Sequence, residues 1–247
     1  FDNFFVPPVP YDGGLSIGAC QYLWHSILGN DVIGENFVSP YLGEKYGETD
    51  VVQALDDSKE EIIARENVTI DEAVDLLVEG NIVAIFQGRS ESGRRALGNR
   101  SILANPAYKD MKSIINDKVK HRQWYRPFAP SVLEPEGEEW FENFFPSPYM
   151  GFVFKIKKDK LGKAKAIEHF DGTARIQSVN EDQNPLYFKL ISKFHEKTGI
   201  PLVLNTSFND REPICETPEH SLNCYLGTNI DYLYFPEFKI LVSKNEK

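Results

Sequence analysis

The sequence predicts an α/β fold, and three observations carry that prediction. Helical and strand patterns alternate along most of the chain, which is typical of α/β domains. The predicted strands are short apolar runs bounded by turn residues, as buried strands are. The chain has 247 residues, of which 41% are hydrophobic, so it can form one large domain, or one domain and part of another.

The first 56 residues are predicted to precede the main domain. Three prolines in the first ten residues exclude a regular helix there, and apolar residues at near-helical spacing predict a helix over residues 15–28. A lone helix cannot bury its apolar face, so its partner is expected later in the chain or outside it. Residues 49–55 form a predicted short helix capped by Thr49. We therefore divide the chain into a tail (1–30), a linker (31–56) and a main domain (57–247).

Helices and strands are predicted to alternate through the main domain. Thr69 caps a predicted helix that runs through Val78, and Gly199 closes a later one. Thr217, followed by proline at the first turn, begins the last helix. The predicted strands are residues 81–86, 101–104, 152–156, 174–179, 201–204, 231–234 and 238–242, and the remaining predicted helices are residues 108–119 and 186–198.

The distribution of charge points to an anion site. The formal net charge of −10 argues against broad nucleic-acid binding. The segment from Arg89 to Arg126, however, holds ten basic and three acidic residues, so it carries +7 and the remainder −17. A basic segment inside an acidic protein indicates a focused site for a small anion. The alternative is a solvated charged face.

Cysteine usage and the chain ends indicate the compartment. Cys20, Cys215 and Cys224 are an odd number without C-x-x-C spacing, which fits a reducing compartment and predicts no structural zinc site. No apolar run approaches the ~18–20 residues that cross a bilayer, and no signal-peptide pattern opens the chain, so we expect a cytoplasmic location without membrane contact. Because Phe1 is not Met, we also expect a piece of a longer protein.

The strongest chemical motif is residues 86–101, between two predicted strands. Its glycines free the backbone to turn its N–H groups toward an anion. Its arginines supply permanently charged, forked donors for phosphate or carboxylate oxygens. The segment lacks the GxxxxGK[ST] pattern of a Walker A loop. The alternative is an arginine-rich turn paired with surface acids. The four arginines are Arg89, Arg94, Arg95 and Arg100.

A second basic segment follows at residues 118–130. Arg126 precedes a proline, so its backbone is expected to be extended. The aromatic residues Trp124, Tyr125 and Phe128 either stack on a base or, taken one by one, fill the core.

Two further segments place polar residues near strand ends. In residues 169–177, Arg175 and Gln177 are predicted to share one face of a strand; the alternative is a hairpin turn with solvated flanks. In residues 204–209, short polar side chains follow a buried strand. That arrangement is typical of a binding edge in an open α/β sheet, and equally of a plain polar turn.

These four segments, in this order, resemble the O-carbamoyltransferases of the nodulation-protein and antibiotic type over nearly the whole chain. That family usually has proline between the glycine and the arginine of the first motif, where this chain has Arg94. This departure either adds an anion ligand or disturbs anion binding. The matching stretches are Gly93-Arg94-Arg95-Ala96-Leu97-Gly98-Asn99-Arg100-Ser101, Arg126-Pro127-Phe128-Ala129-Pro130, Asp171-Gly172-Thr173-Ala174-Arg175 and Leu204-Asn205-Thr206-Ser207-Phe208-Asn209.

The resemblance implies an open, twisted, mixed sheet of the threonylcarbamoyl-adenylate-synthase (YrdC-like) type, preceded by the tail of an actin-like ATPase-fold domain. It implies that this C-terminal domain reacts carbamoyl phosphate with ATP, accompanied by Mg²⁺, to give carbamoyl-adenylate. An N-terminal domain that holds iron or another metal would then pass the carbamoyl group to an acceptor hydroxyl. The acceptor would be a sugar, an antibiotic or a lipo-oligosaccharide.

The residues fit that chemistry, because two polyanionic substrates repel unless cations and backbone donors align them. His121 and His169 lie in the motifs and are either catalytic or structural. We expect no protein metal ligands here, since substrate oxygens hold most of the Mg²⁺ shell. The predicted catalytic residues are Arg95, Arg100 and Arg126, and the predicted substrate-binding or nucleotide-binding residues are Arg89, Gly93, Gly98, Lys120, Arg122, Arg175, Asn205, Thr206 and Ser207.

Two other functions remain open from the sequence. The +7 segment with its aromatic residues also suits a module that binds single-stranded RNA or a nucleotide without carbamoyl transfer, although the −17 remainder weighs against nucleic acid. The departure at Arg94 suits a domain that has lost catalysis and binds a nucleotide as a regulator.

Overall fold

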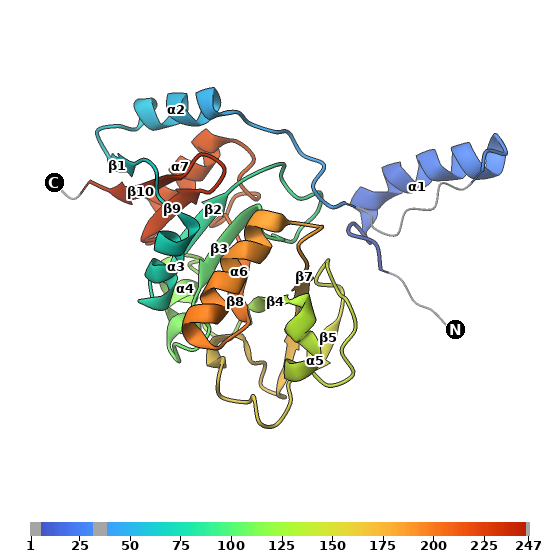
Figure 1. Cartoon of the computed structure of the whole chain (residues 1–247). Helices are drawn as coiled ribbons and strands as arrows, with labels where there is room; N and C mark the ends of the chain where they lie inside the picture. The colour runs from blue at the N-terminus through green and yellow to red at the C-terminus, as the bar shows by residue number, and fades with distance from the viewer. Residues whose placement is uncertain (1–5, 32–38, 246–247) are drawn as a thin grey trace.

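The structure is an α/β domain built around one large sheet (Figure 1). This computed structural model describes residues 6–31 and 39–245. The strands are β1 (Ile62–Arg65), β2 (Val83–Phe86), β3 (Arg100–Ala104), β4 (Ala129–Leu133), β5 (Val153–Lys155), β6 (Thr173–Arg175), β7 (Gln177–Val179), β8 (Leu202–Ser207), β9 (Tyr232–Phe235) and β10 (Ile240–Lys244).

Eight of these strands form a mixed sheet in the order β1-β10-β9-β2-β3-β8-β4-β7. The β2–β9 and β4–β7 pairs are parallel, and the other five neighbouring pairs are antiparallel. β5 and β6 pair separately as an antiparallel two-stranded sheet. The predicted α/β class with a mixed sheet is therefore confirmed.

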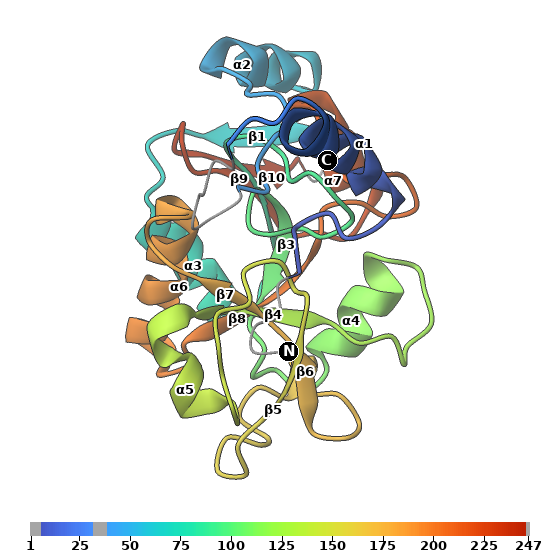
Figure 2. The same cartoon turned by 90° about the vertical axis from the view of Figure 1, so that its right-hand side faces the viewer.

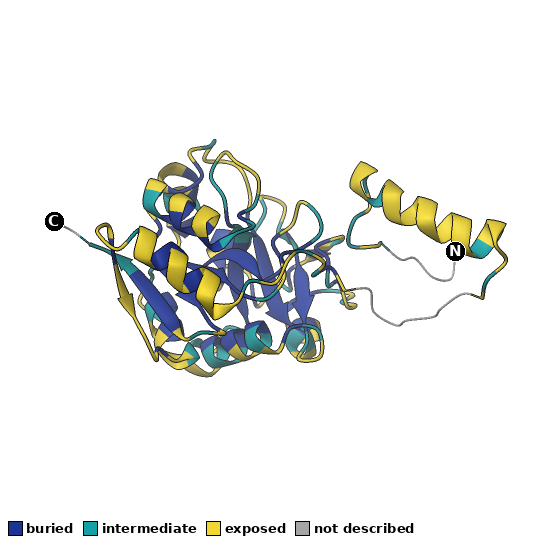
Figure 3. Cartoon of the chain, turned by 90° about the horizontal axis from the view of Figure 1, so that it is seen from above, coloured by how far each residue is buried: buried dark blue, intermediate teal, exposed yellow. Residues whose placement is uncertain are grey.

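Helices cover both faces of the large sheet. Figure 2 shows α4 on one side of it and α3 and α6 on the other, and in Figure 3 the buried strands lie between partly exposed helices. The helices are α1 (Leu15–Gln21), α2 (Glu48–Asp57), α3 (Ile70–Val78), α4 (Met111–Lys118), α5 (Gly137–Trp140), α6 (Pro185–Thr198) and α7 (Pro218–Gly227). The short helical turns are η1 (Asp12–Gly14), η2 (Tyr22–Ile27), η3 (Glu134–Glu136) and η4 (Lys165–Ile167).

The alternation of side chains along β2 shows why its sequence is apolar throughout. Val83 and Ile85 join the core beneath α3 and α6, whereas Ala84 and Phe86 join the core on the opposite face, with residues of α2, α4 and α7. All four residues are buried. A strand covered on both faces needs apolar side chains at every position, so the predicted buried strand is confirmed.

Three helix boundaries follow the predicted capping residues. Thr69 Oγ1 accepts a hydrogen bond from the Glu72 amide at 3.3 Å, and the Glu72 carboxylate accepts one from the Thr69 amide at 2.9 Å. This reciprocal pair starts α3. Thr217 Oγ1 accepts a single hydrogen bond from the His220 amide at 3.1 Å and so caps α7. Gly199, at φ +71, ends α6.

The predicted cap Thr49, by contrast, is wrong. Thr49 lies inside α2, whose N-cap is Gly47, and the Asp50 carboxylate accepts a hydrogen bond from the Gly47 amide at 2.7 Å.

Two strands and one strand boundary differ from the prediction. β1 and β4 were not expected, and β4 lies between β8 and β7 in the large sheet. Pro130 falls inside β4, and a proline within a run argues against a strand at the sequence level. The predicted strand over residues 174–179 is two strands in different sheets, β6 and β7. Arg175 and Gln177 therefore do not share one strand face.

The packed domain begins before the predicted boundary at residue 57. Within the predicted linker, α2 buries Val51, Ala54 and Leu55 in the main core. The tail helix is different: α1 and η2 stand away from the domain with exposed apolar side chains (Figure 3). The linker residues 32–38 lie outside the described part of the chain.

Gly98, a predicted binding residue, is required by packing. Its φ is +111, and a Cβ there would lie 2.3 Å from the ring of Tyr187. We expect Gly98→Ala to lower the free energy of unfolding by about 2–4 kcal/mol, through backbone strain and overpacking. Urea denaturation of the wild type and the variant measures this difference in the free energy of unfolding. Gly162→Ala is the matched control, because Gly162 also has a positive φ (+84) but no atom within 4 Å of its Cβ position. Equal effects of both substitutions would contradict the packing role.

Candidate functional site

A small cavity at one edge of the sheet gathers four arginines. β8 ends at this edge, and β3 and β4 begin there, so the loop between β2 and β3 meets segments that are distant in the sequence. The cavity volume is about 90 Å³. Its lining residues are Arg94, Arg95, Ala96, Arg122, Pro127, Phe128, Ala129, Met150, Arg175, Asn205, Thr206 and Ser207.

The cations of this cavity lack counter-charges. Within residues 6–31 and 39–245, no carboxylate lies within 4.0 Å of the four lining arginines. Burial, and then the charge of Arg126, lower the pKa of Arg122 to about 10. Burial and the neighbouring Arg95 lower the pKa of Arg175 to about 10. Arg175 Nε is also buried without a hydrogen-bond partner among the described residues. The arrangement suits a bound anion. Such an anion would relieve the repulsion between the guanidinium groups and accept hydrogen bonds from their unused N–H donors.

An amide network forms the base of the cavity. Asn205 Nδ2 donates to the carbonyl of Ala96 at 3.0 Å and to Ser131 Oγ at 2.9 Å. Gln177 Nε2 donates to the carbonyl of Leu97 at 2.8 Å, and Ser131 Oγ donates to Gln177 Oε1 at 2.7 Å. The network fixes the turn at residues 96–97 against three strands. Ser131 was absent from the predicted site; its signal is a polar residue at a buried strand position.

Lys120 lies beneath the cavity and positions its Ser207 wall. Its Nζ donates to the carbonyl oxygens of Ser207 and Asn209, and to Asn209 Oδ1 at 2.8 Å. Ser207 Oγ in turn donates to Asn209 Oδ1 at 2.7 Å. Burial, and then the charge of Arg122, lower the pKa of Lys120 to about 7. Lys120 is not among the lining residues, so the structure gives this predicted ligand a positioning role.

Glu91 shapes the arginine loop, and sequence reasoning missed it. Its Oε1 accepts hydrogen bonds from the amides of Leu97, Asn99 and Arg100 at 2.8, 2.7 and 3.2 Å. Burial raises the pKa of Glu91, and these amides together with the Arg100 charge oppose that rise. The available signal was a lone acid within a Gly/Ser/Arg loop that must turn back on itself.

Arg100, a predicted catalytic residue, lies in the core instead. Its guanidinium donates to the carbonyl oxygens of Gln87 at 2.6 Å, Gly88 at 3.3 Å and Glu216 at 3.3 Å, and lies 3.5 Å from the centroid of the Phe86 ring. The side chain is fully buried. Arg100 therefore joins the β2–β3 loop to the segment before α7, and it does not reach the cavity.

Four other predicted residues also lie outside the cavity lining: Arg89, Gly93, Gly98 and Arg126. Arg89 donates to the carbonyl of Gly43 at 2.8 Å and lines a separate cavity of about 320 Å³. Arg126 is exposed, and its charge lowers the pKa of Arg122. Its carbonyl accepts a hydrogen bond from Asn116 Nδ2 at 3.0 Å, and Asn116 Oδ1 accepts one from Arg122 Nε at 2.7 Å. Gly93 lines a cavity of about 360 Å³ next to the arginines. Arg94 and Ser207 line both that cavity and the arginine cavity.

The two histidines of the motifs hold structural hydrogen bonds. His121 Nδ1 lies 3.0 Å from Asp210 Oδ2, and His169 Nδ1 lies 3.0 Å from Thr173 Oγ1. Burial lowers the pKa of His169. Neither histidine lines the arginine cavity.

One group of side chains in the described part of the chain has the composition of a metal site. Glu212, Cys215 and Cys224 place their donor atoms within 4.8 Å of one another. The neighbouring Cys215 thiol, burial and Glu212 together raise the pKa of Cys224. The sequence had predicted no metal ligands, because the two cysteines lack C-x-x-C spacing.

The match to known families agrees with these motifs. A family model described as "Carbamoyltransferase C-terminus" matches residues 74–242. The chain belongs to this family. The predicted resemblance to nodulation-type carbamoyltransferases is thereby confirmed.

Relatives in the carbamoyltransferase C-terminal family are longer than this chain. Nodulation protein NolO of Bradyrhizobium diazoefficiens is 38% identical over 254 residues, which cover 97% of this chain and 45% of that protein. An uncharacterized protein of Methanocaldococcus jannaschii is 38% identical over 250 residues, which cover 97% of this chain and 40% of that protein. The chain thus spans less than half the length of these curated relatives.

Two solved structures are similar to this family member. Full-length HypF in its phosphate- and nucleotide-bound form has a TM-score of 0.45 and 23% identity, covering 62% of this chain and 22% of that one. A variant of P. abyssi Sua5 has a TM-score of 0.45 and 15% identity, covering 68% of this chain and 48% of that one. No helix in the described ranges has the length and hydropathy needed to cross a membrane.

Glu91→Ala is expected to destabilise the domain, because it leaves three buried amides without an acceptor. We expect a loss of about 2–4 kcal/mol in the free energy of unfolding. Glu91→Gln retains an acceptor oxygen and should lose less. Urea denaturation monitored by tryptophan fluorescence gives both values. The control is the exposed residue Glu219. If Glu91→Ala lowered the free energy of unfolding by less than Glu219→Ala does, the proposed role of the Glu91 carboxylate would be contradicted.

Proposed function

We propose that this chain is the activating part of an O-carbamoyltransferase, and that it binds carbamoyl phosphate and ATP to form carbamoyl-adenylate. In balanced form, water converts carbamoyl phosphate to carbamate and phosphate, and a carbamate oxygen then displaces diphosphate from the α-phosphorus of ATP. The carbamoyl group would pass to an acceptor hydroxyl on a sugar, an antibiotic or a lipo-oligosaccharide. This acceptor class follows from the resemblance to the nodulation-type and antibiotic carbamoyltransferases.

The arginine cavity is the observation that carries this proposal. Four guanidinium groups without a facing carboxylate converge on about 90 Å³, a size that suits a phosphate or carbamoyl phosphate group rather than a whole nucleotide. Arg175 offers a buried Nε donor without a partner. Thr206 adds a hydroxyl group to the lining of the cavity. Such a site neutralises an anion and orients it without a proton transfer.

The neighbouring cavity provides room for the nucleotide. Its volume is about 360 Å³, and it shares Arg94 and Ser207 with the arginine cavity. A phosphate chain that extends from one cavity into the other would bring both substrates together. Glu91 Oε2, which has no hydrogen-bond partner in the described structure, and Glu216 line this larger cavity. The Glu216 carboxylate already accepts hydrogen bonds from the Glu44 amide and from Ser90 Oγ, so substrate oxygens are expected to hold most of the shell of a Mg²⁺ ion that accompanies ATP.

In this proposal, each of the main lining residues has a separate task. Arg122 and Arg175 hold the phosphate of the carbamoyl donor and stabilise the charge that develops as it leaves. Arg94, at the boundary of the two cavities, contacts phosphate oxygens on both sides. Ser207 is held in place by Lys120, and its hydroxyl already donates to Asn209 Oδ1, so its task is to fix the cavity wall.

A second candidate function is binding of single-stranded RNA. Trp124 and Tyr125 are 75% and 60% exposed, although core packing was the expected role for each aromatic residue. They lie beside the exposed Arg126, and exposed aromatics next to cations suit base stacking. Phe128, by contrast, is buried. Salt-dependent binding of a short single-stranded RNA that is lost in Trp124→Ala would support this second function.

Calorimetric titration with carbamoyl phosphate tests the main proposal. We expect saturable binding that Arg175→Ala weakens by about 10–100-fold, because one charged hydrogen bond contributes about 1.5–3 kcal/mol. The control is Arg89→Ala, since Arg89 is also an arginine of the predicted site but donates to the Gly43 carbonyl and does not line the arginine cavity. Equal loss in both variants, or no binding to the folded wild type, would contradict the assignment of the cavity.

Replacing Arg94 separates the two interpretations of the departure from the family motif. Because Arg94 lines both cavities, we expect Arg94→Pro and Arg94→Ala each to weaken carbamoyl phosphate binding by about tenfold, as loss of one cationic contact does. The same calorimetric titration measures it. Tighter binding by Arg94→Pro would instead show that Arg94 disturbs the site, and would favour the regulatory function.

A further inference from the structure

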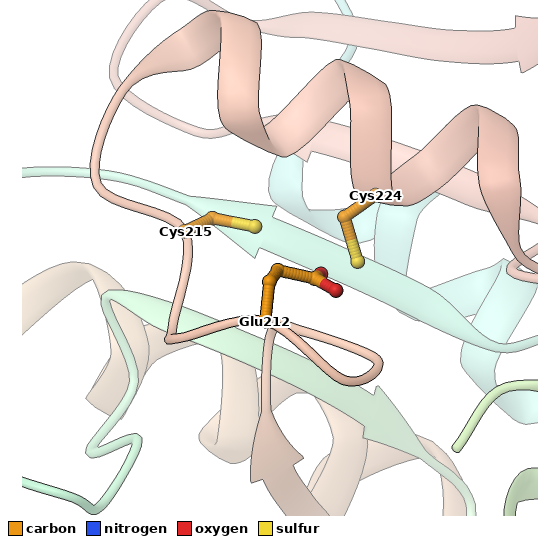
Figure 4. A group of neighbouring side chains, drawn as sticks. All are labelled: Glu212, Cys215 and Cys224. Carbon is orange, nitrogen blue, oxygen red and sulfur yellow. The ribbon is translucent and has the colours of Figure 1, made fainter. Parts of the chain in front are cut away.

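Three donor side chains meet at a second place, away from the arginine cavity. Glu212 and Cys215 project from the loop between β8 and α7, and Cys224 projects from α7 toward them (Figure 4). Their donor atoms lie within 4.8 Å of one another. Both cysteines are buried and free, whereas Glu212 is exposed.

We propose that Cys215, Cys224 and Glu212 form a binding site for a divalent zinc-type metal ion, with a fourth coordination position facing the adjacent cavity. This site is separate from the proposed carbamoyl chemistry and does not depend on it.

The donor set determines the class of metal. Two thiolates select a soft or borderline ion such as Zn²⁺ over Mg²⁺ or Ca²⁺, and a carboxylate is an accepted third zinc ligand. In a tetrahedral zinc site with Zn–S distances of about 2.3 Å, the two sulfurs lie about 3.8 Å apart. The present upper limit of 4.8 Å therefore requires only small side-chain rotations around the ion.

The surrounding cavity offers room and a further acceptor. The three donors line a cavity of about 470 Å³, together with Asp210 and His220. Asp210 Oδ1 is buried and has no hydrogen-bond partner within the described structure. This oxygen is available as a hydrogen-bond acceptor for a water molecule or another group that occupies the fourth coordination position. The cavity thus supplies the open position that distinguishes a three-ligand zinc site from a closed structural one.

The position of the site indicates what the ion would do. Its ligands tie the loop at residues 208–217 to α7, and that loop begins directly after Ser207, where Lys120 already binds Asn209. A bound ion would therefore fix the loop from its far side and stabilise the wall of the arginine cavity.

Metal loading tests the proposal directly. The intact chain, purified under reducing conditions, is incubated with Zn²⁺ or Co²⁺, passed through gel filtration and analysed for metal content. We expect one ion per chain and, with Co²⁺, the absorption bands of a thiolate-bound tetrahedral ion. Cys215→Ser and Cys224→Ser should each abolish the bands. Cys20→Ser, which removes the exposed cysteine of α1, is the matched control and should leave the bands unchanged.

Glu212→Gln changes the one exposed ligand and leaves both buried cysteines in place. The Glu212 carboxylate also accepts hydrogen bonds from the amides of Asp210 and Arg211, so the fold of the variant is checked beside its metal affinity. The substitution should weaken Co²⁺ affinity about tenfold or more while it preserves the circular dichroism spectrum. Three outcomes would overturn the proposal: no retained metal in folded wild type, metal retained without thiolate absorption, or spontaneous oxidation of Cys215 and Cys224 to a disulfide that excludes the ion.

Discussion

One buried carboxylate determines the shape of the arginine loop. Glu91 accepts three amide hydrogen bonds from residues at the point where the loop joins β3. An isolated carboxylate in the interior costs several kcal/mol, and only such donors offset that cost. The contact closes residues 91–99 into a compact turn, and Arg94 and Arg95 lie on the outside of that turn, facing the cavity. The cationic surface of the arginine cavity thus depends on a carboxyl group that does not line that cavity.

The site combines mutually repelling cations with a rigid, uncharged base. Guanidinium groups in a small cavity repel one another, and the lowered pKa of Arg122 and of Arg175 reflects burial and such neighbours. The amides of Asn205 and Gln177 hold the surrounding backbone independently of any ligand. The backbone next to Arg95 is therefore held in place before an anion enters, and the anion neutralises cations that lack a facing carboxylate. This is preorganisation achieved with hydrogen bonds rather than ion pairs.

Local signals in the sequence were sufficient for the elements around the site, and long-range contacts determined the rest. The Thr69 cap and the apolar run of β2 each depend on neighbouring residues, so both were predictable. β4 was not, because Pro130 obscures a strand that exists through its pairing with β8 and β7. Cys215 and Cys224 do not match a local metal motif, yet the turn into α7 brings them together. Of the predicted cavity residues, Arg95, Arg122, Arg175 and Thr206 line it, whereas Arg89 and Arg126 do not.

Arg95 and Arg100 show most clearly why a motif alone does not assign roles. Both belong to one nine-residue stretch, yet Arg95 lies in the turn and faces the cavity, whereas Arg100 begins β3 and its side chain enters the core. Arg100 binds the carbonyl of Glu216, at the end of the same 208–217 loop that Lys120 holds at its start. Two buried cations thus anchor opposite ends of the loop that carries Glu212 and Cys215. The arginine cavity and the proposed metal site therefore adjoin the same segment, residues 207–217. An ion bound at one site would restrict the backbone that contributes to the other.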